Sequence, residues 1–147
     1  MHSAATGEVF RLIYRSRDRI PLDERRAQLG ELFSQARTNN KRQGLTGALL
    51  ITDDYFVQTL EGDEQVVRGL FARIEVDPRH DRVEVLDAGT VAGRVFVRWS
   101  MAKVAEDGEA DINLIAHVQG IAAASSRGDG TLEQEGVLKV MRDAARD

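Results

Sequence analysis

The sequence predicts an α+β fold in which one mostly antiparallel sheet carries two helices on the same face. Short segments with alternating apolar and polar residues, typical of strands, surround two longer segments whose apolar residues recur at helical spacing. Along the chain the order is strand, helix, strand, strand, helix, strand, with one further strand after them. The 147 residues are 42% hydrophobic and 30% charged, which matches one compact domain and excludes a disordered or fibrous chain.

The first strand, the first helix and the second strand are expected between residues 8 and 54. The segment EVFRLIYRS (8–16) alternates and predicts a strand, and LTGALLITDD (45–54) predicts a second, largely buried strand. A helix is expected from about residue 22 to 40, followed by Gly44 at a position that suits a helix C-cap. The apolar stripe of this helix is Leu29, Leu32, Phe33 and Ala36.

The second half of the predicted sheet begins with a tight turn at Asp53 and Asp54, which leads into the strand DDYFVQTLEG (53–62). A second helix is expected within residues 62–78, and two further strands are expected at 82–90 and 94–104. The resulting β-α-β-β-α-β-β order matches the split-βαβ, ferredoxin-like pattern. The stripe of the second helix is Val66, Val67, Leu70, Phe71 and Ile74.

Residues 105–147 are expected to form a C-terminal extension of two helices, distinct from a domain at residues 9–104. Ile112, Ile115 and Val118 suggest one short helix, and SSRGDG (125–130) suggests a flexible link. The last helix, within residues 131–147, must bury its apolar face against the open face of the sheet or against a second subunit. That apolar face is Val137, Leu138, Met141 and Ala145.

Composition excludes several classes of function. The chain has no cysteine, which rules out disulfides, thiolate metal sites and thiol catalysis. A net charge of -4 argues against nucleic acid, and the three histidines have no ligand spacing, so no metal site is expected. No apolar run reaches the roughly 20 residues that cross a bilayer. The N-terminal segment does not resemble a secretory signal, so the expected location is the cytoplasm.

Gln58 is an unexpected residue in the predicted strand 53–62. Alternation places its amide on the same face as Phe56 and Leu60. A buried amide without hydrogen-bond partners costs about 1–3 kcal/mol, so a polar partner is expected inside the protein. Tyr14, near the end of the first strand, is in phase with the apolar residues of that strand. Asn39 and Asn40 lie at the end of the first helix, where the chain returns to the sheet.

Each of these polar residues has an ordinary structural explanation. A tyrosine at a strand end packs its ring and hydrates its hydroxyl, and an asparagine at a helix end is usually a cap. Together, however, the phenol and the amides suit an uncharged, planar, amide-bearing ligand between the helices. Leu32 and Ile74 are then natural apolar walls for that ligand. The group has no acid, base or nucleophile, which favours binding over hydrolysis.

The sequence resembles the BLUF domain, a blue-light sensor that uses flavin. The resemblance covers roughly residues 9–104 and rests on an ordered set of motifs, of which each alone is weak. The stretches that carry it are RLIYRS (11–16), ARTNNKRQGLTGALL (36–50), FVQTLEGDEQVVRGLFARIEVDPRH (56–80) and RVFVRWSMAKV (94–104).

The resemblance implies a flavin between the two helices, with FAD expected and FMN or riboflavin as alternatives. Asn40 would bind the pyrimidine side of the ring, and Gln58 would bridge the Tyr14 hydroxyl to the flavin. Arg73 and Arg79 fall where the family contacts the ribityl-phosphate part, although either could be a solvated charge at a helix end. The full set of cofactor-binding residues expected is Tyr14, Leu32, Asn39, Asn40, Gln58, Arg73, Ile74, Asp77 and Arg79.

The resemblance also implies a photoreceptor without an enzymatic product. Light-driven electron and proton transfer from Tyr14 would rearrange the hydrogen bonds of Gln58 and give a red-shifted signaling state. Trp99 and Met101, expected in phase on the last strand, would exchange proximity to Gln58 and pass the change to the C-terminal helices. Partners would be the flavin, a homo-oligomer (dimer or larger) and a downstream signaling protein.

Two other classes of protein fit parts of the sequence. One is a flavin-free ferredoxin-like module for binding or dimerisation, in which the fold would be right and photochemistry absent. The other is a small acylphosphatase-like hydrolase, which needs an arginine-rich phosphate cradle. The loop at residues 15–19 is basic but has no glycine, which argues against the hydrolase.

Overall fold

The structure is a computed structural model, and it describes residues 7–105, 110–113 and 132–145. A six-stranded sheet lies at its centre, with the order β4-β1-β3-β2-β5-β6. The pairs β1/β3, β1/β4 and β2/β3 are antiparallel, whereas β2/β5 and β5/β6 are parallel. The strands are β1 (Val9–Asp18), β2 (Thr46–Ile51), β3 (Tyr55–Gly62), β4 (His80–Val91), β5 (Ala102–Ala105) and β6 (Ile112–Asn113).

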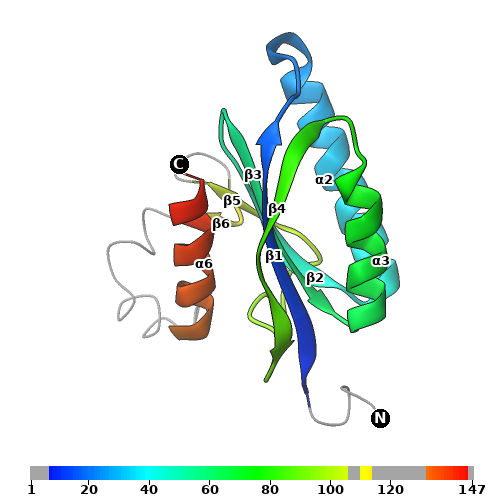
Figure 1. Cartoon of the computed structure of the whole chain (residues 1–147), viewed down its shortest axis with the longest axis vertical. Coiled ribbons are helices and arrows are strands. Elements are labelled where there is room, and N and C mark those ends of the chain that lie inside the picture. Colours follow the sequence, from blue (N-terminus) through cyan, green and yellow to red (C-terminus); the bar gives the residue numbers. More distant parts are fainter. Residues whose placement is uncertain (1–6, 106–109, 114–131, 146–147) are drawn as a thin grey trace.

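Two helices lie on one face of this sheet, as the sequence predicts (Figure 1). After a short 3-10 turn, η1 (Leu22–Glu24), helix α2 runs over Arg25–Gln43, so it begins and ends three residues later than expected. It ends at Gly44, whose positive φ of 72° is the left-handed conformation typical of a glycine C-cap. Helix α3 (Glu64–Glu75) begins at Asp63, whose side chain accepts a hydrogen bond from the Val66 amide.

The third described helix, α6 (Leu132–Ala144), packs on the opposite face of the same sheet (Figure 1). Of the two locations that the sequence left open, α6 therefore occupies the sheet of its own chain. Because side chains alternate along β3, this strand contributes to the cores on both faces of the sheet. Phe56 and Leu60 lie in the core under α2 and α3, and Val57 lies in the core under α6.

The strand predicted at 94–104 is wrong over most of its length, because only Ala102–Ala105 pair as β5. In the segment before it, side chains take hydrogen-bonding groups that a strand partner would use. The Glu61 carboxylate accepts from the amides of Val95 and Phe96, and Asn40 Nδ2 donates to the Ser100 carbonyl. Sequence alternation alone cannot reveal such long-range competition.

The short helix expected near residues 112–118 is also absent from the part of this stretch that the structure describes, residues 110–113. Ile112 lies in the two-residue strand β6, which pairs with β5, and its side chain is buried in the core under α6. Ile115, Val118 and the link at 125–130 lie outside the described residues. The spacing of these isoleucines fits a helix, but the exposed edge of β5 offers Ile112 a backbone partner.

No helix among the described residues is long and apolar enough to span a membrane.

Gly47 lets β2 and β3 approach closely, and this generates a first prediction. A Cβ atom at residue 47 would lie 2.1 Å from the backbone carbonyl oxygen of Thr59, which cannot move without opening the strand pair. We expect Gly47→Ala to lower the free energy of unfolding by about 1–3 kcal/mol, measured by urea denaturation. Gly89→Ala is the matched control, since nothing lies within 4 Å of its added Cβ and its change should stay within about 1 kcal/mol.

Candidate functional site

A cleft of about 140 Å³ opens between α2, α3 and the sheet. Apolar side chains form most of its walls, with Leu32 on α2 and Ile74 on α3 as the sequence predicts. Polar groups lie at its base and mouth, where Gln58, Asp77 and Arg79 face it. The complete lining is Leu32, Gln35, Ala36, Asn39, Leu49, Phe56, Gln58, Leu70, Ile74, Asp77, Arg79 and His80.

The Gln58 amide lies between Tyr14 and Met101. The Tyr14 hydroxyl donates to Gln58 Oε1 at 2.5 Å, and Gln58 Nε2 donates to the Met101 sulfur at 3.6 Å. All three residues are at most 5% exposed. A thioether can only accept a hydrogen bond, and weakly, so among these groups the amide oxygen belongs on the tyrosine side. The buried glutamine therefore has a partner at each end of its amide.

Register places Tyr14 and Gln58 opposite each other on β1 and β3. Burial raises the pKa of the Tyr14 phenol above its ordinary value, and the negative charge of Asp77 raises it further. An unperturbed phenol, with a pKa of about 10, is already protonated at neutral pH. The Tyr14 hydroxyl is therefore held as a proton donor, and a proton leaves it only when the ring itself is oxidised or the protein reaches strongly basic pH.

An ion pair lies at the mouth of the cleft. Arg79 Nε and Nη2 contact both carboxylate oxygens of Asp77 at 2.6–3.2 Å, in the forked geometry that arginine and carboxylate favour. The hydrogen bond from Arg79 is the main reason that the pKa of Asp77 lies below its ordinary value. Both residues are partly exposed and can turn toward a charged or polyol group at the cleft mouth.

His80 is a cleft residue that sequence reasoning missed. Its Nε2 lies 2.6 Å from the Ile74 carbonyl oxygen, and its Nδ1 lies 2.6 Å from the Ser16 hydroxyl. The ring also contacts the rings of Tyr14 and Phe56 at centroid distances of 6.1 and 5.9 Å. His80 therefore ties β1 to the end of α3. The signal for it was weak: Ser16 is in phase with Tyr14, but nothing in the sequence pairs it with a histidine 64 residues away.

The two asparagines of α2 take different positions, and neither is the cap of the helix. Asn39 lines the cleft. Asn40 is 1% exposed, and its Nδ2 donates to the Ser100 carbonyl at 2.8 Å. Its Oδ1 is buried and has no hydrogen-bond partner among the described residues. A buried amide oxygen of this kind can accept a bond from a ligand N–H group.

Five predicted site residues are not part of the cleft lining: Tyr14 and Met101, which contact the lining residue Gln58, and Asn40, Arg73 and Trp99. Arg73 is exposed on α3 and is not part of the lining. Trp99 is partly buried and packs against the core under α6, whereas Met101 belongs to the core under α2 and α3. The two residues therefore face opposite sides of the sheet, and the expectation that they lie in phase on a strand is wrong because the strand begins only at Ala102.

Among the described residues no cluster of acidic and histidine side chains could hold a metal ion. The fold and the cleft define a class of protein: a small α+β ligand-binding domain whose ligand cleft ends in a buried tyrosine–glutamine–methionine chain. The chain belongs to the BLUF family, described as sensors of blue light using FAD, whose family model matches residues 9–102.

Relatives extend this assignment. The chain is 37% identical over 98 residues to photoactivated adenylate cyclase subunit alpha of Euglena gracilis, covering 65% of this chain and 10% of that protein. The dark-state structure of the BLUF protein BlrB is 30% identical with a TM-score of 0.67, over 96% of this chain and 98% of BlrB. The photo-activated state of BlsA is 32% identical with a TM-score of 0.65, over 67% of this chain and 71% of BlsA.

The chain spans only about a tenth of the length of the cyclase relatives that it matches. Their cyclase activity is therefore not carried over to this chain by the match. BlrB, in contrast, matches nearly end to end.

The Asp77–Arg79 pair generates a prediction on pH. Because the pKa of Asp77 is lowered in the folded protein, its stabilising effect is complete above its unfolded pKa of about 3.9 and is lost as pH falls below that value. Denaturation measured from pH 6 to pH 3 should show a smaller loss of unfolding free energy in Asp77→Asn than in the unchanged protein. Arg79→Met, which removes the cause, should flatten the profile in the same direction. Identical slopes in all three proteins would contradict this assignment.

Proposed function

We propose that this protein is a blue-light photoreceptor that binds flavin in the cleft between α2 and α3, with Tyr14, Gln58 and Met101 as its photoactive chain. The observation that carries the proposal is the buried Tyr14–Gln58–Met101 arrangement, because it supplies an oxidisable phenol and a polar amide relay next to the cleft. Family membership supports the same conclusion.

The residues of the cleft suit a flavin. The ring system of a flavin is flat, with a polar, amide-bearing edge, and Leu32 and Ile74 supply apolar walls. The unpartnered Asn40 Oδ1 is a suitable acceptor for the ring N–H group, and Asn39 supplies a second amide. Asp77 and Arg79 are placed to hold the ribityl and phosphate part, with Arg73 as a more distant candidate. We propose FAD, with FMN and riboflavin as alternatives.

A bound flavin would supply a blue-light-absorbing oxidant. The chain's own residues then determine where the proton moves. Tyr14 is the electron and proton source, and its O–H bond points at Gln58 Oε1, so the proton leaves along that hydrogen bond. The Gln58 amide, once it loses this donor, rearranges by rotation or tautomerisation. The Met101 sulfur accepts only weakly, so it opposes this change little. Return of the electron and proton to Tyr14 restores the dark state with no net reaction.

The output is proposed to pass through residues 105–147, with residues 9–104 as the flavin-binding domain. Helix α6 covers the face of the sheet opposite the cleft and is therefore placed to respond to changes in β3 and in the segment before β5 (Figure 1). We propose that the photoreceptor catalyses no reaction of its own and signals to a downstream protein, as a dimer or larger homo-oligomer. The same proposal includes an exchange in which Met101 leaves Gln58 and Trp99, which packs under α6 in this structure, moves toward it.

The decisive experiment is an absorption difference spectrum of the purified protein before and after blue light. We expect a yellow protein whose flavin bands shift to the red by several nanometres and recover in the dark. Tyr14→Phe and Gln58→Leu should remain yellow and lose the shift, because each breaks the relay without opening the cleft. Gln35→Leu, which alters a cleft residue outside the Tyr14–Gln58–Met101 chain, is the matched control and should keep the shift.

A colourless preparation that takes up no added flavin would instead favour a flavin-free binding module. A full red shift in Tyr14→Phe would rule out the proposed relay while leaving flavin binding intact.

Asn40 generates a separate prediction on affinity. Removing its amide in Asn40→Ala takes away both the proposed flavin acceptor and the donor to Ser100. We expect flavin to bind about tenfold or more weakly, in line with the roughly 1–3 kcal/mol of one buried hydrogen-bonding group. Fluorescence titration of the flavin-stripped protein with FAD, FMN and riboflavin measures this and ranks the three flavins. An unchanged dissociation constant would remove Asn40 from the binding site.

A further inference from the structure

Residues 93–101 connect β4 to β5. One backbone hydrogen bond, from the Gly47 amide of β2 to the Trp99 carbonyl, ties them to the sheet, and side chains from several other elements hold the segment as well. Arg11 Nη2 donates to the Gly93 carbonyl, and the Glu61 carboxylate accepts from the amides of Val95 and Phe96. At the other end of this segment, Asn40 donates to the Ser100 carbonyl and Arg37 to the Met101 carbonyl. The segment ends at Met101, whose sulfur contacts Gln58.

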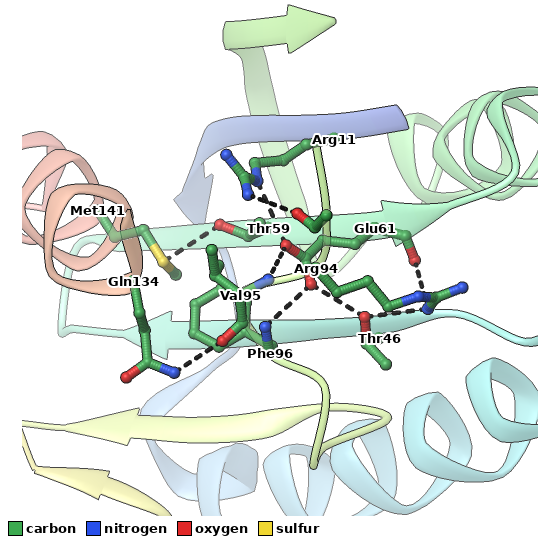
Figure 2. Close-up of polar contacts among 10 residues, drawn as sticks. Arg11, Thr46, Thr59, Glu61, Arg94, Val95, Phe96, Gln134 and Met141 are labelled. Atoms are coloured by element: carbon green, nitrogen blue, oxygen red, sulfur yellow. Dashed lines mark hydrogen bonds and ion pairs between the residues drawn. The ribbon is translucent and has the colours of Figure 1, made fainter. Parts of the chain in front are cut away.

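Glu61 lies three residues beyond Gln58 on β3 and is fully buried at 0% exposure. Figure 2 shows its carboxylate at the centre of a polar network that comes from β1, β2 and residues 94–96. One oxygen accepts from Thr46 Oγ1 at 2.9 Å and from the Phe96 amide at 3.1 Å. The other accepts from the Val95 amide at 2.8 Å and from Arg11 Nε at 3.3 Å.

These four donors use the four acceptor positions that a carboxylate offers. Burying a carboxylate carries a large desolvation cost, and a well-packed apolar side chain often stabilises a fold as well or better. Stability is therefore a weak explanation for Glu61. What an apolar residue could not do is fix the positions of two consecutive backbone amides.

The same segment is tied to α6. Gln134 Nε2 donates to the Val95 carbonyl at 2.7 Å, so Val95 bonds to β3 through its amide and to α6 through its carbonyl. A second contact joins Thr59 Oγ1, next to Gln58 on β3, to the Met141 sulfur of α6 at 3.2 Å. Figure 2 shows both contacts on the α6 side of the sheet.

We propose that Glu61 is a positioning residue for the light response, which anchors residues 95–96 so that movement of Met101 beside Gln58 is passed through the Val95 carbonyl to Gln134 of α6. This inference rests on the proposed photoreceptor function for its trigger. The mechanical part, that Glu61 and Gln134 set the packing of α6 in the dark, does not depend on flavin.

The first test is Glu61→Gln, which keeps the size of the side chain. Its NH2 group must face one of the two donor pairs, and a backbone amide of Val95 or Phe96 then has no acceptor. Hydrogen exchange of the α6 amides, measured in the dark, should become at least threefold faster. Dark recovery of the red shift should change at least threefold in rate. Glu61→Asp, which retains the carboxylate, should return both rates part of the way to those of the unchanged protein. A purely space-filling role for Glu61 predicts no such recovery.

The second test is Gln134→Leu, which removes the hydrogen bond from α6 to the Val95 carbonyl and covers the case in which Glu61→Gln fails to fold. The red shift should remain, since the relay is intact, while the light-induced change in α6 exchange should fall at least threefold. Glu133→Leu is the matched control, because Glu133 is the exposed neighbour on the same helix and its replacement should leave that change intact.

Two outcomes would overturn the inference. One is a folded Glu61→Gln protein with unchanged α6 exchange in the dark. The other is a light-induced change in α6 exchange that persists in full in Gln134→Leu. An unchanged protein without any red shift would instead contradict the proposed photoreceptor function, and the dark exchange experiment would still test the anchoring role of Glu61.

Discussion

The buried amide of Gln58 is the constraint on which the site depends. An amide has a donor end and an acceptor end, and neither can be left without a partner in an apolar core at low cost. Tyr14 satisfies the acceptor end strongly, and Met101 satisfies the donor end only weakly. This arrangement is therefore held mainly by the phenol. Chemistry that changes the phenol must change the amide, and the sulfur resists that change little.

Residues 93–101 are held in a defined position although they do not form a strand. Several of their backbone groups bond to the side chains of Glu61, Arg11, Asn40 and Gln134, which come from both faces of the sheet, and the Trp99 carbonyl bonds to the Gly47 amide of β2. Hydrogen bonds from side chains can adjust individually, whereas a strand ladder shifts as a whole. A segment held in this way is suited to carry a local change from the cleft to the opposite face.

β3 links the two faces because its side chains alternate. Phe56, Gln58 and Leu60 face the cleft, while Val57, Thr59 and Glu61 face α6 or the segment beside it. A change at Gln58 therefore occurs in the same strand, one residue from a contact with α6 and three residues from the carboxylate that anchors residues 95–96. The short distance along a stiff strand would give the proposed light response a physical route from the cleft to α6 without a large domain motion.

The sequence alone determined the order of the main elements and both faces of β3, because period-2 alternation and helical spacing are local properties of the chain. The meeting of Tyr14 with Gln58 was implied by the resemblance to the BLUF family and not by periodicity. The sequence also predicted Leu32, Ile74, Asp77 and Arg79 at the cleft, through motifs whose order is specific. Only the tertiary structure decided that Trp99 and Met101 face opposite sides, that Ile112 joins a strand, and that His80 and Glu61 have their partners. Those outcomes depend on hydrogen bonds between groups far apart in the sequence, and such bonds override local propensity wherever a buried polar group must be satisfied.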